Sequence, residues 1–456
     1  MKTIATFAAL IASLLLPAGA GAAAGSLDHS FSGDGRLRVQ ATPGPRVDQF
    51  DVTGVSRISV ASAAAPDDEL VVASDRRVLR YRADGRPRAY FGGNGQVVIP
   101  VATETSFQLA GIGADSRGRV LVAGTTAAPT SGATNPSSAA TVYRFLPSGA
   151  LDRSFGDGGL ATIAASPFGG SSVRLTGLAL DSAGRAVLTG FSVASTSVCG
   201  GYPPDRVVYR NRTFVLRLNG NGAPDHHFGT AGFYAEGELE DPDLPAIFPS
   251  GRIVFANRTG PRCPGEATGT APGLTALSPG GLFEHRFPVG PDGSYEHVES
   301  LSVAVDTRNR VVVLVLRAPG EGGGGRRFQV RRYLADGTPD PGFGAAGTTR
   351  PQLPPGGAPA ALVTDGRNRV VLAGSTPRGQ KARAFLALRL NAAGKVQRWF
   401  GDDGWAIAGV GRRAKAWTSE VHRDSSGRIV LGGIVESRSL PTGYDLAFAR
   451  LLSGGR

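Results

Sequence analysis

The chain has 456 residues, too many for one ordinary hydrophobic core, so it contains several domains or a repeating array. Its 66 glycines, 31 prolines and single methionine favour short strands between turns over long helices. The net charge of +12 comes from arginines scattered along the chain, without the dense basic clusters of a specific nucleic-acid binder. A solvated basic surface and contact with an anionic cell-wall polymer both stay open.

The first 24 residues predict a cleaved secretory signal. Lys2 precedes an apolar run from Ile4 to Leu16, and small residues follow, with Ala-x-Ala frames that end at Ala20, Ala22 and Ala24. No later stretch has about 18 consecutive apolar residues, so we expect no transmembrane segment. Residues 25–456 are expected to be exported and secreted or held in the cell envelope, with a net charge of +11 because Lys2 is the only charge removed.

A turn signature recurs along residues 25–456. It is written polar-x-x-Gly-x-Leu/Pro-Asp-x-x-Phe-Gly-x-x-Gly, and its phenylalanines lie 56 to 73 residues apart. The copies centre on Phe31, Phe91, Phe155, Phe228, Phe343 and Phe400, with a worn copy at Phe287. We expect this repeated phenylalanine to be a buried wedge between neighbouring units rather than a ligand contact.

A second signature, Asp-x-x-Gly/Asn-Arg between two apolar strands, lies between these copies. Its Asp and Gly are typical of a tight hairpin. One unit then contains four short strands, illustrated by residues 107–114, 119–124, 141–146 and 159–164. Sheets of four antiparallel strands bury both faces when they stack around an axis, so the sequence predicts an all-β, seven-bladed β-propeller.

The two ends of the predicted mature chain complement each other. Residues 25–35 begin inside the turn signature, whereas residues 447–456 supply the strand and turn that precede it in other units. Pairing the two ends in one blade would close the ring and leave no open sheet edge. We therefore expect residues 25–456 to form a single, monomeric propeller domain.

At these residues the sequence resembles the delta-60 repeat family. The closest copy of the family motif is GALDRSFGDGG at residues 149–159, whereas the copy at Phe287 lacks the Asp and both glycines around the Phe. The resemblance covers residues 25–456 and implies an extracellular bacterial propeller with no established activity. The hairpin signature also resembles NHL-type propeller repeats, which include binding proteins and some lyases.

The segments that join the second and third strands of each unit vary most in length, so we expect them to carry the specialised surface. Cys199 and Cys263 fall in two such segments, and in an exported chain this pair predicts a disulfide, with unpaired thiols or a weak metal site as alternatives. The candidate contact residues beside them, which could also be plain solvated loop residues, are Tyr202, Asp205, Arg206 and Arg262.

An arginine recurs after the hairpin turns, at Arg119, Arg185, Arg252, Arg310, Arg369 and Arg428. These side chains form either a positive ring or, since most have an Asp four residues earlier, local ion pairs across the turn. The acidic stretch from Glu236 to Asp243 lacks the residue order of a calcium loop, so we expect no metal and no cofactor.

No familiar catalytic motif is present in the sequence. The candidate general base is His422, because other units carry Gly113, Ala179, Ala304 and Val363 at its position. We expect a non-enzymatic binding or interaction scaffold that acts through the loops between strands two and three, on an extracellular protein or polysaccharide. The alternative is a lyase or hydrolase that uses the axial channel and His422.

Overall fold

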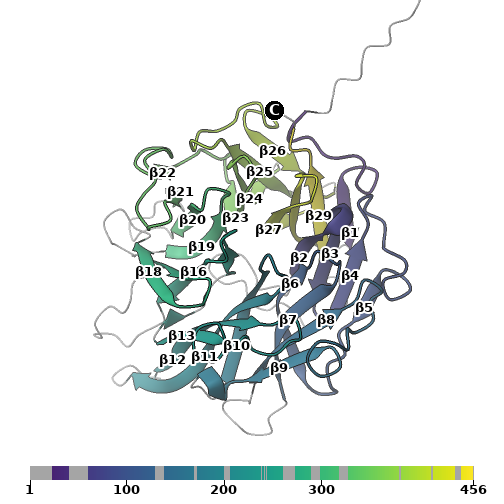
Figure 1. Cartoon of the computed structure of the whole chain (residues 1–456). Coiled ribbons are helices and arrows are strands. Elements are labelled where there is room, and N and C mark those ends of the chain that lie inside the picture. The colour runs from purple at the N-terminus through teal and green to yellow at the C-terminus, as the bar shows by residue number, and fades with distance from the viewer. Residues whose placement is uncertain are drawn as a thin grey trace, which may run out of the picture.

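A computed structural model describes residues 23–40, 60–128, 138–168, 172–199, 206–237, 239–240, 242, 244–259, 273–288, 298–317, 327–378, 382–411, 414–436 and 443–454. Within these ranges the chain forms seven antiparallel sheets that fan around a central axis (Figure 1). The predicted seven-bladed β-propeller is confirmed. No helix in the described ranges is long and apolar enough to span a membrane.

The first four blades follow one another along the chain, each with its inner strand first. Blade 1 contains β2 (Val60–Ala65), β3 (Glu69–Ser74), β4 (Arg77–Tyr81) and β5 (Gln96–Val98). Blade 2 contains β6 (Ser106–Ala114), β7 (Val120–Ala127), β8 (Ser138–Phe145) and β9 (Leu160–Ala164). Blade 3 contains β10 (Ser172–Leu180), β11 (Ala186–Cys199), β12 (Arg206–Leu218) and β13 (Phe233–Gly237). Blade 4 contains β14 (Leu239–Glu240), β15 (Ala246–Ile247), β16 (Ile253–Thr259), β17 (Gly273–Leu277) and β18 (Phe283–Pro288).

The remaining three blades complete the ring. Blade 5 contains β19 (Val298–Val305), β20 (Val311–Arg317), β21 (Arg327–Tyr333) and β22 (Thr348–Thr349). Blade 6 contains β23 (Ala358–Thr364), β24 (Val370–Pro377), β25 (Arg383–Leu390) and β26 (Trp405–Ala408). Blade 7 contains, from the axis outward, β27 (Ala416–Arg423), β28 (Ile429–Glu436), β29 (Tyr444–Leu451) and β1 (Arg36–Val39).

The second strand of each blade is apolar on both faces because a neighbouring blade covers each side. In β7 the run from Val120 to Ala123 is at most 1% exposed. A strand buried on both faces shows no alternation of polar and apolar residues. The core therefore lies in layers between blades, as where Val312 and Leu314 of blade 5 pack with Val370 and Leu372 of blade 6.

The Asp-x-x-Gly/Asn-Arg signature forms the predicted hairpin between the first two strands. Asp115 Oδ1 accepts the backbone N–H groups of Arg117 (3.0 Å) and Arg119 (2.9 Å). Gly118 has a φ of +73°, the left-handed conformation that favours glycine, and Asn309 takes this position in blade 5 with a φ of 59°. The side chain of Asp and the backbone freedom of Gly or Asn thus set the turn.

Blade 7 is shared by the two ends of the chain. β1 pairs antiparallel with β29, with Arg36 opposite Ala449 and Val39 opposite Leu446. Leu27 also bridges to Leu451. Figure 1 shows β1, near the start of the colour scale, beside the yellow β29. The predicted pairing of the N- and C-terminal segments in one blade is present.

The signature phenylalanines are buried wedges, as predicted, with an exposed fraction of at most 2% for Phe31, Phe91, Phe155, Phe228, Phe343 and Phe400. Phe287, the worn copy, is also buried, with 1% of its surface exposed, but it lies in a strand and not in a turn. Phe287 lies inside β18, opposite Leu274, and packs edge-on against Tyr333 at 5.7 Å. In blade 4 the strand β18 already begins at Phe283, so Phe287 packs against the next blade from the strand, and a Cβ at Gly337 of blade 5 would meet its ring at 3.3 Å.

Candidate functional site

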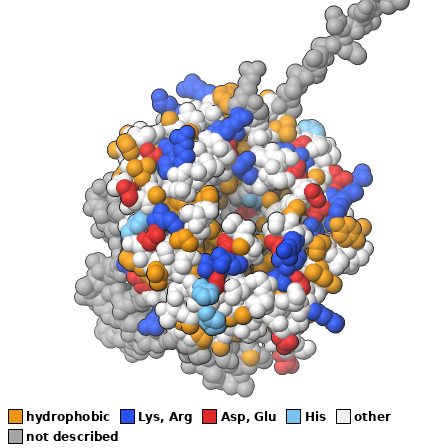
Figure 2. All heavy atoms as spheres, in the orientation of Figure 1, with side chains coloured by type: hydrophobic (Ala, Val, Ile, Leu, Met, Phe, Trp, Pro, Cys, Tyr) orange, Lys and Arg blue, Asp and Glu red, His pale blue; other side chains and the backbone are white. Residues whose placement is uncertain are grey.

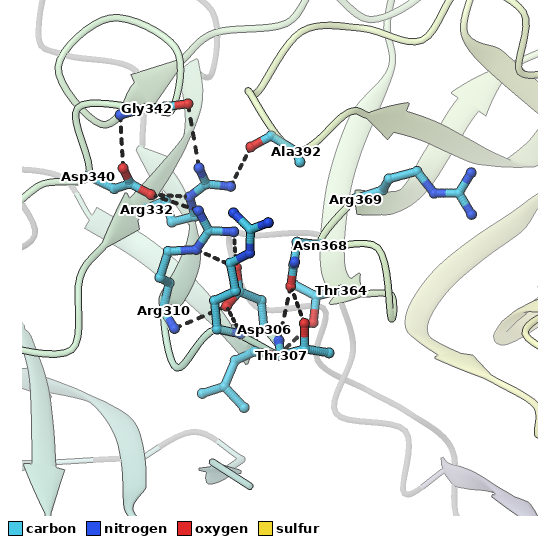
Figure 3. Close-up of polar contacts among 12 residues, drawn as sticks. Asp306, Thr307, Arg310, Arg332, Asp340, Gly342, Thr364, Asn368, Arg369 and Ala392 are labelled. Atoms are coloured by element: carbon cyan, nitrogen blue, oxygen red, sulfur yellow. Dashed lines mark hydrogen bonds and ion pairs between the residues drawn. The ribbon is translucent and has the colours of Figure 1, made fainter. Parts of the chain in front are cut away.

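The charged residues of the repeat form a network between neighbouring blades, which we call the arginine latch. In blade 5, Arg332 on β21 donates from Nε to Asp340 Oδ2 (2.7 Å) and from Nη1 to the carbonyl of Ala392 in blade 6 (2.6 Å) (Figure 3). Its guanidinium lies 4.4 Å from the ring centre of Phe343. Arg310, after the hairpin turn, bonds Asp306 (2.7 Å) and also Asp340 (3.2 Å). The latch thus joins both turns of one blade to the next blade.

The same arrangement recurs in blades 2, 3 and 7. The third-strand arginine bonds the signature aspartate there in the pairs Arg144–Asp152, Arg217–Asp225 and Arg450–Asp28. Burial alone would raise the pKa of Asp340, but the Gly342 N–H and the guanidinium groups of Arg332 and Arg310 hold it below its ordinary value. Each carboxylate is therefore ionised at neutral pH and engaged inside the fold.

Blade 1 keeps the ion pair with its charges exchanged. Glu69 takes the place of the turn arginine, and Arg88 takes the place of the signature aspartate, with 3.0 Å between Arg88 Nε and Glu69 Oε1. Arg80, the third-strand arginine, bonds Glu69 Oε2 at 2.5 Å. The two positions attract each other with either arrangement of charges. The pair therefore stabilises the fold and is not a binding site for ions of one sign.

The turn arginines therefore form local ion pairs and not a free positive ring. Arg119, Arg185, Arg310, Arg369 and Arg428 each contact the aspartate four residues earlier. Arg252 instead pairs with Glu284. Figure 2 shows basic and acidic side chains side by side around a hollow near the middle of the face in view.

A different polar cluster lies at the inner end of the interface between blades 7 and 1. Glu420 and His422 are both on the inner strand β27, and we call them the axial pair. Glu420 Oε2 accepts the backbone N–H of Ser62 on β2 (2.8 Å), and Ser62 Oγ lies 3.5 Å from His422 Nδ1. Glu420 Oε1 and His422 Nε2 are buried and have no hydrogen-bond partner among the described residues.

Burial perturbs the pKa values of both members of the axial pair. It raises the pKa of Glu420 to about 7 in spite of the hydrogen bonds from Ser62. It lowers the pKa of His422 to about 4, so the imidazole is neutral at neutral pH. A carboxyl group that titrates near neutrality beside a neutral imidazole is able to donate and accept protons.

Packing at the other blade interfaces explains the size of the axial pair but not its polarity. In blade 2 the equivalent residues are Gly111 and Gly113, and a Cβ at Gly111 would meet Leu178 of blade 3 at 2.9 Å. At the interface of blades 7 and 1 the sizes are reversed, because β2 after Val60 consists of alanines and Ser62. Apolar side chains at these two positions would leave no buried polar atom to satisfy. The axial pair is therefore the candidate functional site.

The structure places the sequence-predicted site residues in different parts of the protein. His422 lies in the axial pair, near the hairpin turn of Asp424. Tyr202, Asp205, Arg262 and Cys263 lie outside the described residues, as does the predicted signal except for residues 23 and 24. Cys199 and Arg206 are described in their backbones alone and pair with each other in register at the ends of β11 and β12.

Sequence comparison missed Glu420, although its signal was present. Counting back four residues from the turn aspartate gives Gly111, Gly177, Ser302 and Ala361 in other blades. An acid in this column stands out in the same way as His422 in its own. Among the described residues there is no group of three His, Cys, Asp or Glu side chains that could hold a metal ion.

Comparisons with known proteins agree with the fold. Residues 118–155 and 318–343 match the family model described as "Domain of unknown function (DUF5122) beta-propeller". No curated protein matches the sequence significantly. Among solved structures, the polysaccharide lyase Uly1 is similar with a TM-score of 0.51 and 9% identity, over 94% of this chain and 100% of that one.

Two further structures are more distant. A protein of unknown function from Dyadobacter fermentans gives a TM-score of 0.40 at 14% identity, over 76% of this chain and 95% of that one. The GH93 alpha-L-arabinofuranosidase of Fusarium graminearum gives 0.39 at 13% identity, over 78% and 97% of the two chains. At these identities the similarity concerns the fold, not the activity.

Proposed function

We propose that this protein is an exported binding or interaction scaffold that presents the loops between the second and third strands of its blades. The arginine latch is the observation that supports it most directly. In blades 2, 3, 5 and 7 the recurring charged residues pair with one another inside the fold, so the described part of the repeat stiffens the ring. Specificity then falls to the parts that differ between blades.

The loops between strands two and three are additions to a hairpin that does not need them. In blade 1 only residues 75–76 separate β3 from β4, whereas 260–272 lie between the corresponding β16 and β17. These loops leave the sheet at the end opposite the Asp-x-x-Gly/Asn-Arg turn. The partner is an extracellular protein or polysaccharide, or an anionic cell-wall polymer attracted by the net positive charge.

A loop exchange tests the scaffold proposal. Residues 200–205 and 260–272 are each replaced by the Asp-Arg turn of blade 1, with Cys199→Ser in every protein compared. The matched control replaces residues 378–382 of blade 6 in the same way. Each protein is mixed with the insoluble envelope fraction of the producing cells and sedimented. We expect the control to sediment and the exchanged protein to stay in solution; equal sedimentation would reject these loops as the binding surface.

The axial pair supports a second candidate, a lyase or hydrolase that acts in the axial channel. Glu420 and His422 face the same neighbouring strand, and their Cα atoms are about 7 Å apart by strand geometry. Their shifted pKa values suit an acid and a base at neutral pH. The test is release of reducing or unsaturated ends from a panel of polysaccharides. Activity that disappears in both Glu420→Gln and His422→Gln would favour the enzyme over the scaffold.

A further inference from the structure

One turn of the ring is built from both ends of the chain. In the continuous turn of blade 2, Gly149 donates its N–H to the Leu146 carbonyl (2.8 Å), and Leu146 donates to the Ala150 carbonyl (2.8 Å). Where the two ends of the chain meet, the Gly25 N–H donates to the Leu452 carbonyl (2.7 Å), and the Leu452 N–H donates to the Ser26 carbonyl (2.9 Å). The same two hydrogen bonds thus form across a break in the chain.

The neighbouring blade also binds this split turn as though it were continuous. Blade 5 binds two consecutive carbonyls of blade 6, with Arg332 on Ala392 and the Gly344 N–H on Ala393 (2.9 Å). Blade 6 uses Arg389 to bind the carbonyl of Ser453. The Gly401 N–H then binds the carbonyl of Ala24 at 2.8 Å. Ser453 therefore replaces Ala392, and Ala24 replaces Ala393.

Gly454 shows that the place after Ser453 is already taken by Ala24. Gly454 follows Ser453 along the chain but turns away with a φ of +65°. A Cβ at Gly454 would collide with the Cβ of Ala24. Ala24 is 7% exposed, whereas Ala23 is exposed. Among the described residues at this end of the chain, burial thus begins at Ala24.

We propose that the exported precursor is cut upstream of Ala24, so that Ala24 stays as the missing residue of the split turn. Three Ala-x-Ala frames end at Ala20, Ala22 and Ala24. A cut after Ala24 would remove the carbonyl that Gly401 binds. The last frame that keeps it ends at Ala22, where hydrolysis gives Ala22 the new carboxyl group and Ala23 the new amino group, with water as the co-reactant.

This inference rests on the proposed export, and sequencing the amino terminus of the exported protein tests the two separately. A first residue of Ala23 or Gly21 supports the inference. A first residue of Gly25 or later overturns it while leaving export intact. A protein that keeps Met1 and stays inside the cell overturns export, and the cut with it.

The structural part is tested on purified proteins that begin at Ala23 or at Gly25. We expect the Gly401 amide hydrogen to exchange at least about tenfold faster in the protein that begins at Gly25, because its acceptor is gone. The Gly344 amide, bound to Ala393, is the matched control and keeps its rate. Equal exchange of Gly401 in the two proteins would contradict the role of Ala24.

The variant Gly454→Ala supplies an independent check in both proteins. The new methyl group collides with Ala24 in the longer protein and finds that place empty in the shorter one. The positive φ of Gly454 adds the same strain in both, so the difference between the two losses of melting temperature measures the contact with Ala24. We expect the larger loss in the protein that begins at Ala23; identical losses would contradict the split turn.

Discussion

Blade 6 lacks the aspartate of the arginine latch, and Arg389 shows the consequence. Blade 6 carries Gln397 where blades 2, 3, 5 and 7 carry the signature aspartate, and Nε and Nη2 of Arg389 are buried without a hydrogen-bond partner among the described residues. Burial, with Arg369 nearby, lowers the pKa of Arg389 to about 10. Stacking on Phe400 and the bond to Ser453 hold this guanidinium in place. The buried charge is incompletely compensated.

Gln397→Asp should complete the latch of blade 6. The new carboxylate would stand where Asp340 stands against Arg332, and a hydrogen bond to a charged group contributes about 1.5–3 kcal/mol. We expect the free energy of unfolding in urea to rise by about that amount. Gln397→Asn, of the same size but neutral, is the control and should gain less. A destabilised Asp variant would show that blade 6 is already compensated in another way.

Glu420 and His422 should make the stability of the fold depend on pH in opposite directions, and the two effects should largely cancel. The folded protein holds the Glu420 proton more tightly than the unfolded chain, so the Glu420 contribution to stability falls as pH rises from about 4.5 to 7. It binds a proton on His422 more weakly, so the His422 contribution rises with pH from about 4 to 6.5. Between about pH 4.5 and 6.5 the two slopes oppose each other.

Single variants separate these two slopes. Relative to the native protein, Glu420→Gln leaves His422 alone, so its stability should rise more steeply between pH 4 and 6.5. His422→Gln leaves Glu420 alone, so its stability should fall between pH 4.5 and 7. Urea unfolding at several pH values measures the difference from the native protein, in which other titrating groups cancel. Profiles parallel to that of the native protein would refute the burial of this pair.

At the scale of one blade, the exchange of charges in blade 1 explains why its sequence departs from the repeat. Glu69 and Arg88 look like two unrelated losses of the signature when each is compared with its own column. In the structure they contact each other and Arg80, so each departure compensates the other. The exchange was not predictable from the sequence, because the two residues are 19 positions apart and nothing in the sequence identifies either as the partner of the other.

The exchanged pair is open to a double-mutant cycle. Glu69→Arg alone places a third arginine beside Arg80 and Arg88 and should cost about 3–5 kcal/mol of unfolding free energy. Adding Arg88→Asp restores the arrangement of blade 2, where Arg119 and Arg144 meet Asp152, and should recover most of the loss. Losses that simply add in the double variant would show that the two residues do not interact.

Other parts of the blades were predictable to different degrees. The wedge at Phe155 and the hairpin at Asp115 were predictable from the repeat alone, because the same residue type recurs at the same position in several units and has the same structural role in each. Phe287 is buried like the other wedges, but its place in a strand and not in a turn was not predictable from the repeat. Glu420 stood out in its repeat column, but its contact with Ser62, 358 residues away in the sequence, was not predictable.

At the scale of the whole molecule, the closing blade joins the two ends of the chain by the same devices that join other blades. Arg450 at the C-terminal end bonds Asp28 at the N-terminal end, as Arg144 bonds Asp152 within blade 2. Residues 25–35 and 447–456 predicted this closure because each end carried half of a known unit. The loop face was predicted from length variation alone, and most of its residues lie outside the described ranges.

A designed disulfide across β1 and β29 tests the closed ring most directly. Arg36 and Ala449 are register partners, so the double variant Arg36→Cys, Ala449→Cys brings two thiols together if the ends share a blade. The control, Arg36→Cys with Leu446→Cys, places them three residues out of register. Mass spectrometry of the oxidised, digested protein should find the peptides of residues 36 and 449 linked in the first variant and unlinked in the control. Absence of that link, or an equal link in the control, would contradict the closed propeller.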